Sequence, residues 1–338
     1  MASEKITSLD VAKRAGVSQS AVSRVFTPGA SASKTTTEKV KHAANELGYR
    51  PNILARSLIT GKSRVIGLVV AYLENHFYPD ALEKLSTALQ AQGYHVLVFM
   101  ASKTAGNVDD VMEEILDYQV DGIVAASVAL SSELAERCRA EGIPVVLFNR
   151  SQDDDRLSAV TSDNFNGGRK VAEFLVAGGH KRMAYVAGWE GASTQRDREL
   201  GFKSGLSVAG DLSYARAVGD YTSEGAKAAT RALFAGLAKP DAVFVANDHM
   251  AFIVMDVLRF ELGLSVPNDV SVVGYDDVPL AGWPAYDLTT VRQPANRMVN
   301  ETVDILMNTI MNGEMQPKRV AIDGPLIVRG SAKVPEGW

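Results

Sequence analysis

The 338-residue sequence is poor in cysteine and has no long apolar runs, and each shortage excludes a class of protein. It contains a single cysteine, Cys138, so an internal disulfide framework is excluded and a reducing compartment is expected. No apolar run approaches the roughly 18 residues that a membrane span requires. The opening residues, MASEKITSLDVAKRAG, lack the apolar segment of a signal peptide. We therefore expect a cytoplasmic protein with no membrane contact.

Signatures of catalysis and of resident cofactors are also missing. There is no complete P-loop, no G-x-S-x-G, no H-E-x-x-H, and no G-x-G-x-x-G opening a helix after a strand. The five histidines show no metal-ligand spacing. We expect no catalytic residue, no metal and no cofactor. An enzyme is still an alternative, because a fold alone does not decide function.

Charge is distributed unevenly along the chain. Residues 1–64 contain 11 Lys and Arg against 4 Asp and Glu, whereas the remainder contains 24 against 36. A small basic module joined to a large acidic one suggests that the first part meets a polyanion and the second does not.

Short helices separated by a glycine are predicted near the N-terminus. Thr7 can cap a helix over SLDVAKRA, with Asp10 near the positive end of its dipole. Gly16 allows a tight turn, and Ser18 can cap a second helix, QSAVSRVF. A third helix is expected over TTTEKVKHAANELGY, capped by Thr35. This arrangement is that of a helix-turn-helix, whose second helix enters the DNA major groove.

The second helix has one polar side that suits base recognition. Gln can bond adenine in bidentate fashion, Arg can bond guanine in the same way, and Ser can serve a base or a phosphate. A solvated face on an ordinary three-helix bundle is the alternative. The polar residues of this side are Gln19, Ser20, Ser23 and Arg24.

Three stretches, TSLDVAKRAGVSQSAVSRVF, LGYRPNILARSL and IGLVV, occur in an order and spacing that resemble the LacI/GalR family of bacterial transcriptional repressors. The resemblance continues through the whole chain. It implies an N-terminal all-α helix-turn-helix headpiece with a hinge helix, followed by an α/β two-lobed periplasmic-binding-protein-like domain. The implied ranges are 1–50 for the headpiece, 51–64 for the hinge helix and linker, 65–330 for the effector-binding and dimerisation domain, and 331–338 for a tail.

The resemblance also implies which residues contact DNA. Gln19, Ser20 and Arg24 match base-reading positions, and Ser18 and Ser23 match positions that fix the backbone. In this family the hinge helix orders on operator DNA, and the residue matching Leu58 wedges into the central base step of the minor groove. The full set implied is Thr7, Ser18, Gln19, Ser20, Ser23, Arg24, Asn52, Ala55, Arg56 and Leu58.

From Val65 onward, short β-branched runs alternate with amphipathic helical segments. Such alternation predicts parallel sheets covered by helices on both faces, and the length favours two half-domains. In the family these are lobes joined by three crossovers, expected here near Asp163, Val291 and Ala321. The N-lobe would then comprise about 65–162 and 292–321, and the C-lobe about 163–291 and 322–330.

Ligands of open α/β sheets bind beyond the carboxyl ends of the strands, so polar and aromatic residues there are candidates. Asp and Asn suit vicinal hydroxyls, Arg offers a planar fork, and aromatic rings cover a sugar ring. A neutral sugar, a sugar acid and a sugar phosphate are all left open. Positions matching the family's effector cleft, with Trp283 of the following loop added, are Phe77, Tyr78, Arg150, Asp163, Arg198, Asn247, Asp276 and Trp283.

Together these features predict a sequence-specific transcriptional regulator, most simply a repressor, that binds a palindromic operator in double-stranded DNA. The segment after the last expected strand, SAKVPEGW, is too short for a tetramer-forming helix, so a homodimer is expected. A small-molecule effector bound between the lobes would control DNA binding. A transport-type binding protein is the rival, but it would need an export signal and no basic headpiece.

Overall fold

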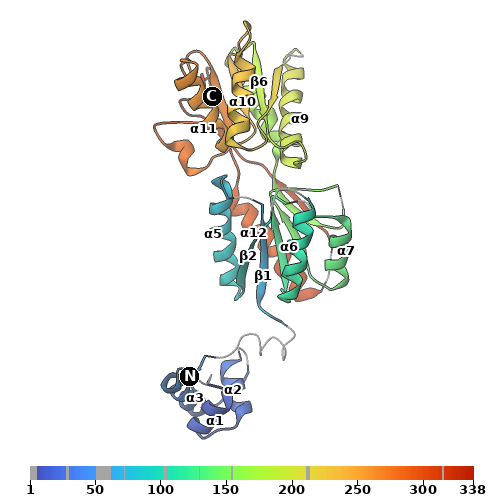
Figure 1. The fold of residues 1–338 in the computed structure, drawn as a ribbon, viewed down its shortest axis with the longest axis vertical. Helices are drawn as coiled ribbons and strands as arrows, with labels where there is room; N and C mark the ends of the chain where they lie inside the picture. Colours follow the sequence, from blue (N-terminus) through green and yellow to red (C-terminus); the bar gives the residue numbers. More distant parts are fainter. Residues whose placement is uncertain are drawn as a thin grey trace. The chain divides into compact units, whose positions relative to one another are not determined.

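The structure is a computed structural model in which two compact units are separated at residue 63 (Figure 1). The first unit is helical, and the second is built on two sheets. The expected fold class is therefore confirmed. The residues described are 6–27, 30–50, 62–71, 73–101, 105–128, 130–153, 155–210, 214–313 and 316–338.

The helical unit begins with two short, well-capped helices, α1 (Ser8–Ala15) and α2 (Gln19–Phe26). Thr7 and Asp10 form a reciprocal capping box at the start of α1, as their spacing predicted. Gly16 ends α1 with φ 66°, a conformation that costs glycine nothing. The Ser18 hydroxyl then accepts a hydrogen bond from the Ala21 amide, which confirms it as the cap of α2.

The third helix, α3 (Lys34–Leu47), begins earlier than the sequence suggested. Ser33 is its cap: its backbone is extended, and its hydroxyl accepts a 3.1 Å hydrogen bond from the Thr36 amide. The expectation that Thr35 caps this helix is wrong, because Thr35 already lies within the first turn. The three helices enclose a small core made of Val11, Ala12, Val22, Val40, Ala43 and Ala44.

The first sheet of the larger unit has the strand order β11-β5-β4-β3-β1-β2, and all its pairs are parallel. The central strands β1, β3 and β4 are apolar on both faces, as is typical of parallel strands covered by helices. We call this sheet with its helices the N-lobe. Its elements are β1 (Val65–Val70), α5 (Phe77–Ala91), β2 (His95–Met100), α6 (Ala105–Asp117), β3 (Gly122–Ala126), α7 (Ser132–Ala140), β4 (Val145–Phe148), β5 (Ser158–Ser162), α12 (Ala295–Asn312) and β11 (Arg319–Ile322).

The second sheet has the order β12-β10-β9-β8-β6-β7, and only the short β12 is antiparallel to its neighbour. We call it with its helices the C-lobe. Its elements are α8 (Asn164–Ala177), β6 (Met183–Ala187), α9 (Ser193–Val208), β7 (Tyr214–Val218), α10 (Ser223–Phe234), β8 (Ala242–Val245), α11 (Asp248–Asp256), η1 (Val257–Glu261), β9 (Ser271–Asp276), η2 (Pro279–Gly282), β10 (Thr289–Arg292) and β12 (Leu326–Ile327).

The chain passes between the two lobes three times, after β5, after β10 and after β11. The three passages are bonded to one another. The Asp163 amide donates to the Ile322 carbonyl, and the Arg292 amide donates to the Pro325 carbonyl, each at 2.9 Å. Gly324 lies so close to the second passage that an added Cβ would come within 2.0 Å of the Arg292 carbonyl oxygen.

Helices α8 and α9 pack with their backbones almost in contact. A Cβ on Gly168 would lie 2.0 Å from the Arg198 carbonyl oxygen, and one on Gly201 would lie 1.9 Å from the Phe165 carbonyl oxygen. This close approach fixes the start of both helices at the edge of the sheet. Across the described residues, no helix combines the length and the apolar character that crossing a bilayer requires.

Candidate DNA-binding face and interlobe site

The predicted base-reading side of α2 is exposed to solvent along its whole length. The Gln19 side-chain amide donates to the Ser8 hydroxyl at 2.9 Å, and the hydroxyls of Ser18 and Ser20 lie 2.9 Å apart. No described residue pairs with the Arg24 guanidinium. The side chains on this face are therefore held by exposed hydrogen bonds that a nucleic acid could replace at low cost.

Thr7 has a different environment from the other candidates in the headpiece. Its hydroxyl donates to the Asp10 carboxylate at 2.6 Å and accepts from the Asp10 amide at 3.4 Å. These bonds from Thr7 lower the pKa of Asp10. In this structure the Thr7 hydroxyl is thus occupied by the helix cap. Four other candidates, Asn52, Ala55, Arg56 and Leu58, lie outside the described residues.

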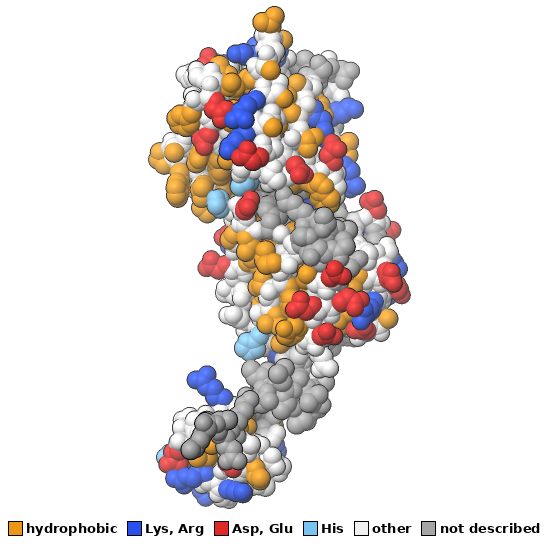
Figure 2. Space-filling view, in the orientation of Figure 1, with side chains coloured by type: hydrophobic (Ala, Val, Ile, Leu, Met, Phe, Trp, Pro, Cys, Tyr) orange, Lys and Arg blue, Asp and Glu red, His pale blue; other side chains and the backbone are white. Residues whose placement is uncertain are grey.

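The two units differ in surface charge, as the sequence indicated. Figure 2 shows Lys and Arg side chains on the helical unit and a group of acidic side chains on the N-lobe. The exposed acidic residues of α6 and α7 include Glu113, Glu114, Asp117, Glu133 and Glu136. Such a surface repels a phosphate backbone, so this face of the N-lobe is not suited to contact DNA, whereas the basic helical unit is.

A narrow hollow lies between the two lobes, at the carboxyl ends of the strands. Each lobe contributes five residues to its lining, and the enclosed volume is about 10 Å³, which is room for about one water molecule. The lining from the N-lobe is Asn75, Tyr78, Ser127, Asn149 and Arg150. The lining from the C-lobe is Thr194, Arg198, Tyr221, Asn247 and Asp276.

Four of the ten lining residues have a backbone that non-glycine residues rarely adopt. Their φ angles are 61° for Ser127, 56° for Asn149, 56° for Tyr221 and 128° for Asp276. Only a few per cent of non-glycine residues have positive φ, and such residues cluster at functional sites. Each lies at or just after the end of a strand, where the chain turns sharply to point a side chain into the hollow.

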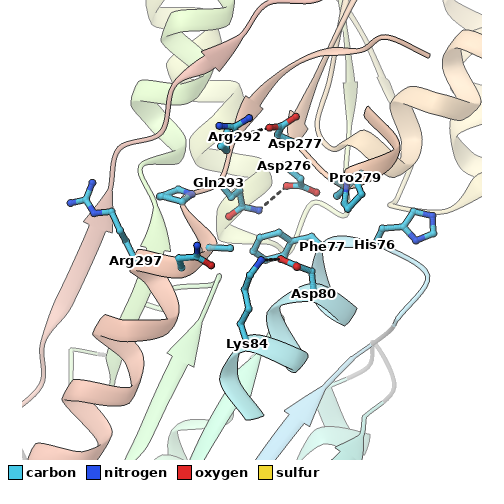
Figure 3. A pocket seen from close by; sticks show the side chains of 14 residues that line it. His76, Phe77, Asp80, Lys84, Asp276, Asp277, Pro279, Arg292, Gln293 and Arg297 are labelled. Atoms are coloured by element: carbon cyan, nitrogen blue, oxygen red, sulfur yellow. Dashed lines mark hydrogen bonds and ion pairs between the residues drawn. The ribbon is translucent and has the colours of Figure 1, made fainter. Parts of the chain in front are cut away.

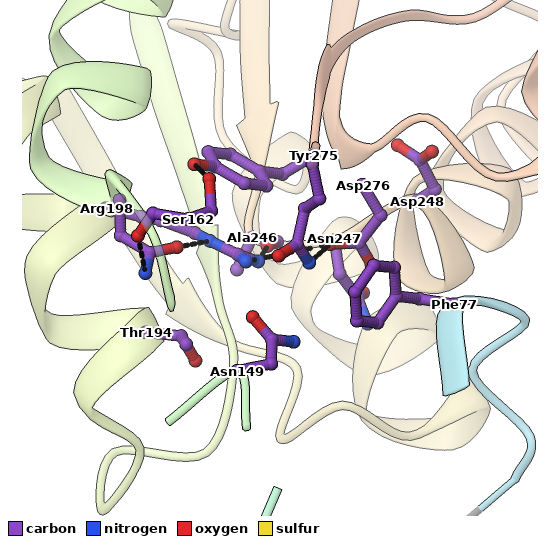
Figure 4. A network of polar contacts seen from close by, with 12 residues as sticks. Phe77, Asn149, Ser162, Thr194, Arg198, Ala246, Asn247, Asp248, Tyr275 and Asp276 are labelled. Atoms are coloured by element: carbon purple, nitrogen blue, oxygen red, sulfur yellow. Dashed lines mark hydrogen bonds and ion pairs between the residues drawn. The ribbon is translucent and has the colours of Figure 1, made fainter. Parts of the chain in front are cut away.

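A buried ion pair forms the C-lobe wall of the hollow. The guanidinium of Arg198 lies 3.6 Å from a carboxylate oxygen of Asp276, and both side chains are at most 3% exposed. Arg198 also donates to Asn164 at 2.8 Å, and its guanidinium stacks 3.6 Å above the Tyr275 ring. Figure 4 shows this guanidinium extended toward Asp276, with Asn149 facing the pair.

The Asp276 carboxylate is held between the lobes rather than within one. It accepts hydrogen bonds from Gln293 at 2.7 Å and from Asn75 of the N-lobe at 3.3 Å. Burial nevertheless raises the pKa of Asp276 to about 6, against the opposing effect of Arg198. A carboxylate with this pKa changes charge close to neutral pH, so its hydrogen bonding to a hydroxylated ligand would depend on pH.

Asp248 lies next to Asp276, and its carboxylate is hydrogen-bonded within the C-lobe. It accepts hydrogen bonds from the Thr290 hydroxyl at 2.6 Å and from the Val278 amide at 3.0 Å. Burial, reinforced by the nearby Asp276, raises the pKa of Asp248 well above its usual value. Because it is bonded to its own lobe and does not line the hollow, Asp248 supports the site rather than facing a ligand.

Three polar atoms around the hollow have no hydrogen-bond partner among the described residues. They are Oδ1 of Asn149, Nε of Arg150 and Nδ2 of Asn247. Their other polar atoms are used: Asn149 donates to the Tyr78 hydroxyl at 3.2 Å, and Asn247 accepts from the Met250 amide at 3.0 Å. An unsatisfied buried polar atom costs about 1–3 kcal/mol, and three around one hollow point to a ligand that bonds them.

The structure brings together five of the eight candidate effector residues, namely Tyr78, Arg150, Arg198, Asn247 and Asp276. Phe77 is buried beside them, with its ring 5.4 Å from that of Tyr78. Phe77 lines the neighbouring cavity instead, and the remaining two candidates line neither space. Asp163 caps α8 by accepting from the Asn166 amide at 3.0 Å, and Trp283 is 56% exposed at the end of η2.

Five lining residues were not among the candidates: Asn75, Ser127, Asn149, Thr194 and Tyr221. Ser127 and Asn149 directly follow the apolar runs GIVAA and PVVLF; the strand-end rule does point to Asn149, but neither residue matches a position of the family's effector cleft that was carried over. Tyr221 follows β7, whose sequence, YARAV, has little apolar character and predicted no strand. Thr194 lies in the first turn of α9, where nothing in the sequence distinguishes it from its neighbours.

A larger cavity of about 370 Å³ lies next to the hollow and shares Asp276 with it. Phe77, Asp80 and Lys84 of α5 form one side, and Gln293 lies on the other (Figure 3). Lys84 pairs with Asp80, and Arg292 pairs with Asp277, so most of its charges are already compensated. Two of its lining groups have no partner among the described residues, namely the buried Oε1 of Gln293 and the exposed guanidinium of Arg297.

A basic helix-turn-helix unit and a two-lobed domain with a polar interlobe hollow define a ligand-responsive DNA-binding regulator. Comparison with known proteins supports the same class. Residues 7–52 match the model of the bacterial regulatory proteins of the lacI family, and residues 172–332 match that of the periplasmic binding protein-like domain. The chain belongs to the lacI family of bacterial regulatory proteins, and it is a transcriptional regulator rather than an enzyme.

Relatives match along nearly the whole chain. The ribose operon repressor of Escherichia coli K12 is 30% identical over 332 residues, covering 96% of this chain and 99% of the relative. The transcriptional regulator CelR of Thermobifida fusca is 33% identical over 334 residues, covering 95% and 96%. The structure of the Lac repressor dimer bound to operator and the anti-inducer ONPF has a TM-score of 0.87 at 27% identity, covering 97% and 99%.

Proposed function

We propose that this chain represses transcription as a homodimer bound to a palindromic operator, under the control of a sugar or sugar derivative bound in the interlobe hollow. The single observation that supports this most is the occurrence of both sites in one chain. An exposed base-reading face on α2 accompanies a buried hollow with three unsatisfied polar atoms. Relatives named as sugar-operon repressors, and one solved as a dimer on operator, support the same proposal.

In this proposal Gln19, Ser20 and Arg24 read base edges in the major groove, and Ser18 and Ser23 bond phosphates. Two copies would place two α2 helices in successive half-sites about one helical turn apart. Asn52, Ala55 and Arg56 would contact the minor groove, and Leu58 would wedge into its central step. The protein would act in the cytoplasm, at the nucleoid when bound to DNA.

The effector would be held by residues of both lobes. Asp276 and Arg198 of the C-lobe would bond ring hydroxyls, and Tyr78 and Phe77 of the N-lobe would lie against the ring. A hollow of about 10 Å³ cannot hold a sugar, so binding requires the lobes to separate. A change in the angle between lobes would then alter whether two hinge segments can meet, which links effector to operator.

Effector titrations on a defined operator test this proposal. An operator would be selected from random duplexes with the full-length protein, and its affinity measured by fluorescence anisotropy with and without sugars. Coupling of this kind is typically about 1–3 kcal/mol, or about 5–150-fold in affinity, and must be reciprocal. If no duplex is preferred over random sequence at moderate salt, or no sugar derivative changes operator affinity, the proposal is wrong.

A second measurement isolates the hinge. Leu58→Ala should weaken operator binding and reduce DNA bending while leaving effector affinity unchanged, because the wedge does not touch the lobes. Bending would be followed by energy transfer between dyes at the two ends of the duplex. Equal bending by the variant and the parent protein would exclude the wedge role.

A further inference from the structure

Arg150 differs from every other charged group of the hollow in having no counter-ion. Arg150 is buried, with 7% of its surface exposed. One guanidinium nitrogen donates to the Ser127 hydroxyl at 3.3 Å, and the Trp189 ring lies 5.3 Å from the guanidinium carbon. Nε has no partner, and none of the described carboxylates forms an ion pair with Arg150.

Arg198, which lines the hollow from the C-lobe, differs from Arg150 because its positive charge is compensated. It has the Asp276 carboxylate at 3.6 Å, the Asn164 oxygen at 2.8 Å and the carbonyl of Ala246 as further acceptor. With Asp276 assigned to Arg198, the lining of the hollow retains one positive charge. Asp248, the next carboxylate behind the wall, bonds Thr290 and Val278 instead.

A buried guanidinium without a counter-ion is costly, because its desolvation is not repaid by a Coulombic partner. The contacts on either side hold Arg150 in place rather than neutralise it. The Trp189 ring lies over the guanidinium, and Gly191 leaves room for that ring, since an added Cβ would lie 2.4 Å from it. Ser127, with its strained φ of 61°, supplies a neutral acceptor. Arg150 lines the hollow, and its buried Nε is left without a hydrogen-bond partner among the described residues.

We propose that the effector is a carboxylated polyol, a sugar acid whose carboxylate pairs with Arg150. Its hydroxyls would bond Oδ1 of Asn149, Nδ2 of Asn247 and the Asp276 carboxylate. A single carboxylate compensates the single excess charge, and its two oxygens match the fork of a guanidinium. A phosphate ester carries up to about two charges near neutral pH and would over-compensate the site. This inference rests on the proposed role of the hollow as the effector site.

Matched ligand pairs test the chemical class. Glucuronate and glucose, galacturonate and galactose, and gluconate and sorbitol differ mainly by the carboxylate, and glucose 6-phosphate adds the phosphate case. Calorimetric titration of the full-length protein should show at least one carboxylate binding about 30-fold or more tightly than its neutral counterpart. Arg150→Gln should remove that preference, and Arg150→Lys should restore part of it. The inference is overturned if no carboxylate exceeds its neutral counterpart, if the phosphate binds best, or if the preference survives in Arg150→Gln.

A stability measurement needs no knowledge of the ligand. Without ligand, Arg150→Met should raise the melting temperature by about 2–4 °C, because an uncompensated buried charge is removed. Arg297→Met is the control for loss of one positive charge, since Arg297 is exposed with no described partner, and it should leave the melting temperature unchanged. A lower melting temperature for Arg150→Met would show that Arg150 is already compensated, and would overturn the inference.

The two proposals fail separately. If glucose or galactose, but no acid, binds the protein and changes operator affinity, the regulator proposal stands and the carboxylate inference is wrong. If sugar acids bind through Arg150 without changing the affinity for the selected operator, the carboxylate inference stands and the regulator proposal is wrong.

Discussion

The polar face of α2 and the interlobe hollow both consist of hydrogen-bonding side chains, yet they are built in opposite ways. On α2 the groups are exposed and bond one another or water, as Gln19 does with Ser8. In the hollow they are buried, and three atoms are left without a partner among the described residues. The DNA-reading face therefore costs the free protein little, whereas the effector site imposes a standing cost that a ligand would remove.

The two regions are therefore suited to different tasks, base discrimination on α2 and switching in the hollow. A face that is satisfied without its partner gains affinity only from good new contacts, so it suits discrimination between bases. A site that is unsatisfied without its partner gains free energy from a ligand that completes it, and it acts as a switch when that ligand binds one arrangement of the lobes more tightly than the other.

Removing the arginine of the buried pair should have the largest effect. Arg198→Met leaves the Asp276 carboxylate buried without its cation and should lower the free energy of unfolding by about 3–5 kcal/mol. Urea unfolding at pH 7 measures this. Arg292→Met is the matched control, because Arg292 also pairs with an aspartate but is 51% exposed, and it should cost no more than about 1 kcal/mol. Equal losses of unfolding free energy in the two variants would contradict the expectation that the buried ion pair matters more than the exposed one.

The pH dependence of stability should single out Asp276. Its pKa is raised from 3.8 to about 6, so the folded protein holds this proton more tightly than the unfolded chain. The contribution of the protonated Asp276 to the free energy of unfolding is present in full below pH 3.8, and it is lost as pH rises through about 6. Asp276→Asn should remove that loss, on the order of 3 kcal/mol between pH 4 and 7. Unfolding curves for both proteins that run parallel over this range would contradict the assignment.

On the exposed face, Arg24→Ala should cost about 1–3 kcal/mol of operator affinity and relax the preference at one base position. Its effect on unfolding should stay within about 0.5 kcal/mol, because the side chain has no described partner. Anisotropy with operator variants measures the first and thermal unfolding the second. A uniform loss over all duplexes would indicate a phosphate contact instead.

The smallest effect separates capping from contact. Ser18→Ala and Ser33→Ala each remove a helix cap and should each lower the stability of the helical unit by about 1 kcal/mol. If Ser18 also bonds a phosphate, its variant should lose more operator affinity than the Ser33 variant does. Hydrogen exchange of α2 and α3 amides reports the first effect, and operator titrations report the second.

Local chemistry predicted the helical unit well, with one informative error. Thr7 and Ser18 were identified as caps because a hydroxyl precedes each amphipathic run. At α3 two hydroxyl residues compete. Thr35 has the spacing of a capping box, but Ser33 has the extended backbone that a cap requires. Spacing alone does not decide which residue leaves the helical conformation first.

In the larger unit, burial determined what the sequence could reveal. Inner strands such as β8, whose residues are all buried, are apolar runs and were predicted. The edge strands β7 and β11 are partly exposed, and their sequences, YARAV and RVAI, gave no strand signal. Residues that follow those strands, such as Tyr221, were missed for the same reason.

The candidate site was predicted in kind but not in detail. Strand ends supplied most of the lining, as the rule for open sheets requires. The sequence does not record whether an aspartate after a strand faces the ligand or caps the next helix. In this structure Asp276 lines the hollow, and Asp163 caps a helix. Nor could it show that Arg198 has a counter-ion whereas Arg150 has none, because that depends on side chains distant in sequence.

The three bonded passages between the lobes limit how the domain can move. Twisting one lobe against the other would shear the main-chain bonds of Asp163 and Arg292, whereas flexing all three segments together leaves both bonds intact. The linkage therefore favours bending of the lobes about one axis over twisting of one lobe against the other. A side chain at Gly324 would push the second and third segments apart, because its Cβ would lie 2.0 Å from the Arg292 carbonyl oxygen, and would therefore disturb the path that links a ligand in the hollow to the angle between the lobes.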